Sequence, residues 1–80
     1  METAEQLRAA RTMAQWTRAE LAQAAGVSDQ TIKRLEGMTG GLIASTTTIA
    51  ALQKALESRG VVFIPGNGGP PGVRFRPTRP

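Results

Sequence analysis

Residues 24–37, AAGVSDQTIKRLEG, place one glycine between two short amphipathic stretches. Glycine enters the left-handed backbone region at little cost, so Gly26 predicts a tight turn. Ser28 follows as a preferred N-cap residue, and apolar residues then recur at helical spacing. The stretch therefore predicts two helices joined by a short turn, with the second helix at about 28–36.

Further helices are predicted on both sides of this turn. Two capping boxes, Thr3 with Gln6 and Thr17 with Glu20, mark the starts of two upstream helices. A threonine cluster followed by apolar residues spaced by three and four marks a downstream helix. The predicted ranges of these helices are about 4–14, 18–25 and 47–58.

The hydrophobic period changes after residue 60. The segment VVFIP is rich in β-branched and aromatic residues, GNGGPPG has turn chemistry, and VRFRP alternates apolar residues with arginine. This pattern predicts a hairpin within 61–76. A disordered tail is the alternative, because an isolated two-stranded hairpin is marginal unless it packs on a core or a second chain.

These elements predict a mainly α fold of two parts. Residues 1–60 are expected to form a compact four-helix domain. Residues 61–80 are expected to form a short C-terminal β-hairpin or extended segment with a basic tail, which serves dimerisation.

The composition argues against several classes of protein. The chain has no cysteine and no histidine, and it shows no paired carboxylate site. Disulfides, thiolate metal sites and the usual general base are therefore absent, and we expect no enzyme, no metal and no cofactor. No apolar stretch is long enough to span a membrane and no signal core opens the chain, so we expect a cytoplasmic protein.

The formal net charge of +4 is unevenly distributed. Residues 1–57 contain six basic and six acidic side chains, whereas residues 58–80 contain four arginines and no acid. A basic end suggests a polyanionic partner such as nucleic acid. A solubilising tail is the alternative explanation.

Residues 7–37, LRAARTMAQWTRAELAQAAGVSDQTIKRLEG, resemble the Cro/C1-type (XRE, phage-repressor-like) helix-turn-helix family. The matching pattern consists of Thr17, ELA at 20–22, GVS at 26–28, Thr31 with Ile32, and LEG at 35–37, without a gap. The resemblance implies a lambda-repressor-like helical domain in a small bacterial or phage transcriptional regulator that binds double-stranded DNA.

The resemblance also assigns base reading to the exposed start of the third helix. Gln30 can pair with adenine, and Arg34 with guanine or a phosphate. A carboxylate is repelled by phosphates, so we favour a role for Asp29 in complementing the helix dipole over base reading. The reading set implied by the family is Ser28, Asp29, Gln30, Thr31, Lys33 and Arg34.

Two residues at the start of the second helix are expected near the DNA backbone. The family commonly has glutamine where this chain has Arg18, and arginine suits a bidentate phosphate contact. An ordinary solvated charge is the alternative. Thr17 is expected to act mainly as a cap, with a phosphate contact as a second possibility.

Three residues receive structural roles. The family frequently joins the positions of Arg11 and Glu36 in a salt bridge that fixes the reading helix on its support. Trp16 precedes a helix cap and is expected to pack on the core rather than to stack on a base.

The hairpin stands where many relatives have a fifth helix that forms dimer contacts. A strand-forming segment there suggests a homodimer built by edge pairing or by hairpin exchange. Arg74 and Arg76 are expected to face solvent, with phosphate contacts as the alternative. The residues expected at the dimer interface are Val62, Phe63, Ile64, Val73 and Phe75.

The leading hypothesis is a sequence-specific homodimeric regulator, with repression as its favoured mode, that binds a palindrome with half-sites about one helical turn apart. The alternative is a protein–protein module, antitoxin-type or antiactivator, that holds another protein through the helical scaffold or the apolar hairpin.

Overall fold

The computed structural model describes residues 1–77. The fold is mainly helical and ends in an antiparallel hairpin, as the sequence predicts. Each helix boundary lies within one residue of the expected one, and the expected basic tail around Arg79 falls outside the described residues. The elements are α1 (Ala4–Ala14), α2 (Arg18–Ala25), α3 (Asp29–Glu36), α4 (Thr46–Glu57), β1 (Val61–Ile64) and β2 (Gly72–Phe75).

Every helix begins at a hydroxyl side chain that accepts a hydrogen bond from a backbone N–H in the first turn. Such caps satisfy donors that have no partner within the helix. Both predicted capping boxes are complete. The four N-cap residues are Thr3, Thr17, Ser28 and Ser45.

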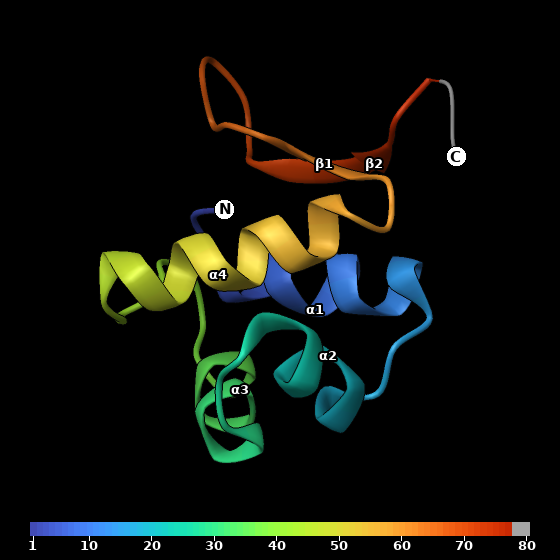
Figure 1. Cartoon of the computed structure of the whole chain (residues 1–80). Helices are drawn as coiled ribbons and strands as arrows, with labels where there is room; N and C mark the ends of the chain where they lie inside the picture. The colour runs from blue at the N-terminus through green and yellow to red at the C-terminus, as the bar shows by residue number, and fades with distance from the viewer. Residues whose placement is uncertain (78–80) are drawn as a thin grey trace.

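The elements form three levels (Figure 1). Helices α1 and α4 occupy the middle, the hairpin covers them on one side, and α2 and α3 lie on the other. One apolar core joins these levels, and its largest fully buried side chains are Leu7, Leu21, Ile32, Leu35, Leu52, Leu56 and Val61. Helix α3 and the hairpin therefore lie at opposite ends of the molecule.

The hairpin packs on this core through one of its two faces. Val61 pairs with Phe75 and Phe63 pairs with Val73, and all four side chains contact the core. The alternate pairs, Val62 with Arg74 and Ile64 with Gly72, share the opposite face, because successive strand residues point to opposite sides. Packing on the helices is what a two-stranded sheet needs to be stable.

A buried glutamine fastens the hairpin to α1. The Gln6 side chain, 3% exposed, donates from Nε2 to the carbonyls of Ile64 and Gly72 at 3.2 and 2.9 Å. Its Oε1 accepts from the backbone N–H groups of Glu2 and Thr3. Sequence reasoning assigned Gln6 only to the capping box, and the structure adds this link across the fold.

Candidate nucleic-acid interface

Helix α3 has two faces of opposite character. Ile32, Leu35 and Glu36 lie three and four residues apart and are buried. Gln30, Lys33 and Arg34 have the same spacing and are exposed. Positions so spaced share one side of a helix, so the buried set anchors α3 and the other set faces outward.

The inner face is held by an ion pair from α1. Arg11 donates from Nε to Oε2 of Glu36 and from Nη2 to Oε1, the second bond at 3.1 Å. The Glu36 side chain is 6% exposed, so the pair is largely removed from water. Arg11 also donates to the Trp16 carbonyl at 3.0 Å, which links this pair to the start of α2.

Arg8 provides a second link that the sequence did not predict. Its Nη1 donates to the carbonyls of Glu36 and Met38, the latter at 3.1 Å. The last carbonyls of a helix lack intrahelical partners and carry partial negative charge, so arginine stabilises them. A basic residue one turn before Arg11 was the available sequence signal. The end of α3 is thus fixed by two arginines.

The side chains at the start of α3 are engaged mainly in capping the helix. Ser28 Oγ accepts from the Thr31 N–H at 3.0 Å and lies 2.8 Å from its hydroxyl oxygen. Asp29 is exposed in the first helical turn, where a carboxylate complements the helix dipole. These three residues have positions suited to stabilising the helix start.

The outward face carries Gln30, Lys33 and Arg34 as exposed side chains. Arg34 donates from Nη1 to the carbonyl of Ile43 at a long 3.4 Å, a weak bond that exposed arginine can exchange for another acceptor. Ile43 itself is 77% exposed beside the helix. The face thus offers one amide and two cationic groups, which are groups able to contact base edges and phosphates.

The chain belongs to the helix-turn-helix domain family. The family model matches residues 2–61, which include all four helices. The match agrees with the resemblance to Cro/C1-type proteins noted in the sequence, and it indicates a DNA-binding regulator in general terms. No curated protein matches the chain significantly.

Within the helix-turn-helix, Gly26 provides the turn. Its φ of 71° lies in the left-handed region, and its N–H donates to the Ala22 carbonyl at 2.9 Å. Thr17 and Arg18 begin the first helix of the motif, and both are exposed. Thr17 is engaged in capping through Glu20, whereas Arg18 has no hydrogen bond or ion pair among residues 1–77. Arg18 is therefore available to a ligand.

The loop after α3 is fastened rather than loosely ordered. The Gly40 carbonyl accepts from the Ala4 N–H, and its own N–H donates to the Glu5 carboxylate at 3.1 and 3.2 Å. Backbone hydrogen bonds, first from the amide of Glu5 itself and then from Gly40, lower the pKa of Glu5. The Glu5 carboxylate already occupies the Gly40 N–H, so this amide is not open to a phosphate.

The hairpin residues expected at a dimer interface do not share one face. Phe63, Val73 and Phe75 pack against the core, whereas Val62 and Ile64 lie on the outer face. Ile64 is 37% exposed. The common apolar surface implied by the sequence is therefore divided, because strand alternation sends three of the five side chains inward.

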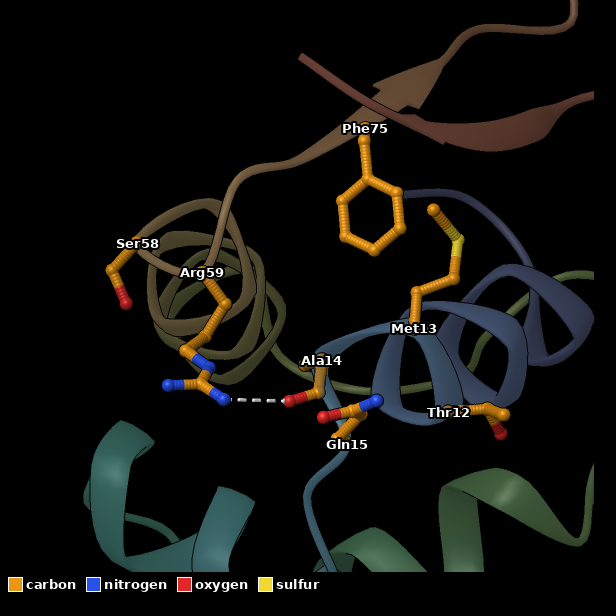
Figure 2. A pocket seen from close by; sticks show the side chains of 7 residues that line it. All are labelled: Thr12, Met13, Ala14, Gln15, Ser58, Arg59 and Phe75. Carbon is orange, nitrogen blue, oxygen red and sulfur yellow. Dashed lines mark hydrogen bonds between the residues drawn. The ribbon is translucent and has the colours of Figure 1, made fainter. Parts of the chain in front are cut away.

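A hollow of about 560 Å³ lies near the ends of α1 and α4, below β2 (Figure 2). The Phe75 ring and Met13 border one side, and Arg59 spans the other with a 3.0 Å hydrogen bond to the Ala14 carbonyl. The Arg59 guanidinium also lies 5.2 Å from the centre of the Trp16 ring, a cation–π distance. Arg59 thus ties α4 to the segment that precedes α2.

No group of three or more potential metal ligands occurs among residues 1–77. In the same part of the chain, no helix combines the length and hydrophobicity needed to cross a membrane.

Proposed function

We propose that the protein is a cytoplasmic, sequence-specific transcriptional regulator that binds a palindromic operator as a homodimer, with α3 in the major groove. Gln30 and Arg34 read base edges in this proposal, and Lys33 supports them. Repression by blocking polymerase access is the proposed mode of action.

The observation that carries the proposal is the exposed outer face of α3. A helix fits the major groove, where glutamine can pair bidentately with adenine and arginine with guanine. Ile32 and Leu35 are fully buried and Glu36 is ion-paired, so the helix is held rigidly enough to present these groups. Arg18, at the exposed start of α2, is proposed to contact a phosphate, as helix starts and arginines do in such complexes.

Ser28, Asp29 and Thr31 are given positioning roles. Their bonding and place in the first turn favour stabilising the start of α3. Asp29 adds a negative charge that disfavours unsuitable DNA sequences, because a carboxylate can accept only from base amino groups, above all that of cytosine, and is repelled by the acceptor edges of other bases.

Arg74 and Arg76 are proposed to face solvent when α3 binds DNA. They belong to the hairpin, at the end of the molecule opposite α3 (Figure 1). An Arg74→Ala, Arg76→Ala variant should therefore leave the slope of log affinity against log salt unchanged. A slope reduced by nearly two units for each bound protomer would instead assign phosphate contacts to both residues.

The protein–protein alternative depends on an apolar patch at Phe63, Ile64 and Phe75. Two of these side chains pack against the core, which leaves Ile64 and its neighbour Val62 on the outer face. That surface is small for a stable protein interface, which buries about 1,200 Å² or more in total. The DNA-binding proposal is therefore favoured.

Selection of bound duplexes from a random pool at physiological salt tests the proposal. We expect enrichment of a palindrome with half-sites about one turn apart. An Asp29→Ala, Gln30→Ala, Arg34→Ala variant that remains folded should lose the enrichment. An absence of enrichment with the unmodified protein would favour the protein–protein alternative.

A further inference from the structure

We propose that Ile43, in the loop between α3 and α4, reads a thymine in the major groove through the C5 methyl group of the base. The inference rests on the proposed function, and it extends the reading surface from α3 to the loop that follows it.

Ile43 is the most exposed large apolar residue among residues 1–77. Its side chain is 77% exposed, whereas Ile64, the next one, is 37% exposed. Single exposed apolar residues are common on protein surfaces, so exposure by itself indicates no ligand. What distinguishes Ile43 is its fixed position beside the outer face of α3.

The backbone is anchored on both sides of Ile43. The Leu42 N–H donates to the Glu2 carbonyl at 3.0 Å, next to the bridge that joins Thr3 to Gly41. On the other side, Ser45 caps α4. Ile43 therefore lies in a short segment between two anchored points rather than at a free loop tip.

The neighbouring side chains hold Ile43 toward the exterior. Leu42 and Ala44 pack against the core, whereas Ile43 between them remains exposed. A β-branched side chain also has few rotamers, so little conformational freedom is lost when it contacts a ligand. Ile43 is thus presented outward in a nearly fixed arrangement.

A hydrogen bond places Ile43 next to the outer face of α3. Arg34 donates from Nη1 to the Ile43 carbonyl at 3.4 Å. The guanidinium has five N–H donors, so Arg34 can keep this bond while other donors meet the edge of a guanine. Ile43 then lies beside the base pair that Arg34 contacts.

The chemistry of the major groove selects the partner of Ile43. An aliphatic side chain has no hydrogen-bonding group, so it gains nothing from a phosphate or from an acceptor on a base edge. The C5 methyl of thymine is the apolar group that the base edges display in this groove. We expect this thymine within about two base pairs of the one that Arg34 reads, since successive pairs lie about 3.4 Å apart.

Uracil in place of thymine tests the contact directly. Uracil keeps the hydrogen-bonding groups of thymine and lacks the methyl, so each thymine of the selected palindrome is replaced in turn, in both half-sites. The base pair that Arg34 reads is the one whose preference is lost in Arg34→Ala. We expect one uracil near this pair to weaken binding of the unmodified protein about threefold for each half-site, the effect of one partly buried methyl.

Substitution of Ile43 completes the test. Ile43→Ala should keep the Tm of the unmodified protein, because the side chain is exposed. It should bind the thymine and uracil duplexes with equal affinity, and Ile43→Val should keep part of the difference. The matched control is Ile64→Ala, which removes the other exposed isoleucine at the opposite end of the molecule (Figure 1). This control should respond to uracil as the unmodified protein does.

Two results would overturn the proposal. An equal loss of affinity for the thymine and uracil duplexes in Ile43→Ala would assign Ile43 a contact with the sugar or a role within the loop. Unchanged binding of Ile43→Ala to every duplex would leave the residue to a protein partner.

The same experiment separates this inference from the proposed function. If the unmodified protein selects no DNA sequence, the proposed function fails and the thymine contact fails with it. If the protein selects a palindrome in which no thymine depends on Ile43, only the thymine contact fails.

Discussion

Arg11 and Glu36 join α1 to the last turn of α3 through two parallel hydrogen bonds between guanidinium and carboxylate. The two side chains are unequally buried, at 24% and 6% exposure. Arg11 has a further acceptor in the Trp16 carbonyl, whereas Glu36 depends on Arg11 for its countercharge.

This asymmetry predicts unequal effects of removing either partner. Arg11→Leu leaves a buried carboxylate without its partner and should lower the free energy of unfolding by about 3 kcal/mol. Glu36→Leu should cost less, since Arg11 keeps the Trp16 carbonyl and some contact with water. The double variant should unfold less easily than Arg11→Leu alone. Denaturant titration measures all three, and additive costs would contradict a coupled pair.

Gln6 should be among the most sensitive polar positions of the fold. Gln6→Leu removes the bonds to Ile64 and Gly72, and it leaves the backbone N–H groups of Glu2 and Thr3 without their acceptor. We expect a loss of about 2 kcal/mol in the free energy of unfolding, together with faster amide exchange in the hairpin.

The exposed Gln23→Ala on α2 is the control for this position. It should change stability by less than about 0.5 kcal/mol. Equal effects of the two variants would mean that Gln6 does not hold the hairpin.

Two helix ends have the same left-handed backbone conformation, but only one of them carries a glycine. Gln15 ends α1 at φ 60°, where a side chain is strained, and Gly26 ends α2 at φ 71°. Gln15→Gly should stabilise the protein by up to about 1 kcal/mol, and Gly26→Ala should destabilise it by about 1 kcal/mol. A Cβ at Gly26 would meet no atom within 4 Å, so the second cost would be conformational. Thermal unfolding measures both, and shifts of the same sign would contradict the explanation.

Acid should weaken the ends of two helices. The backbone N–H of Thr17, followed by its hydroxyl, lowers the pKa of Glu20, and backbone N–H groups lower the pKa of Glu5. A carboxyl group with a lowered folded-state pKa contributes stability above its ordinary pKa and loses it as pH falls through the folded value.

Stability should therefore decline as the pH falls below about 4.3, the ordinary range of a glutamate. A Glu5→Gln, Glu20→Gln variant removes both titrating groups. It should show a smaller difference in Tm between pH 7 and pH 3 than the unmodified protein. An unchanged difference in Tm would show that these two carboxylates do not cause the loss of stability in acid.

Local signals predicted the helices well because each is set by nearby residues. Thr3, Thr17 and Ser28 cap helices within one turn of themselves, and Gly26 sets its turn alone. The hairpin was also predicted from its alternation. Apolar Val73 and Phe75 between arginines also indicated which face of β2 packs on the core. The packing face of β1 was not predicted, because all four residues of VVFI are apolar.

The links between distant parts of the chain were harder to predict. Gln6 contacts residues 58 and 66 positions away, and Arg59 contacts Ala14 at a separation of 45. No local pattern indicates such partners, since they arise only when the helices pack. Arg11 with Glu36 could be anticipated because a family resemblance supplied the pairing.

Gln30 and Arg34 are proposed to read base edges, while the buried face of α3 anchors the helix. The most direct measurement is the ratio of affinities for the selected palindrome and a scrambled duplex, at fixed salt, for the unmodified protein and for Gln30→Ala, Arg34→Ala. Both substituted residues are exposed, so the fold and Tm should be retained. Each base contact contributes about 1–3 kcal/mol and the variant removes two, so the ratio should fall by at least tenfold. An unchanged ratio in the folded variant would contradict the account.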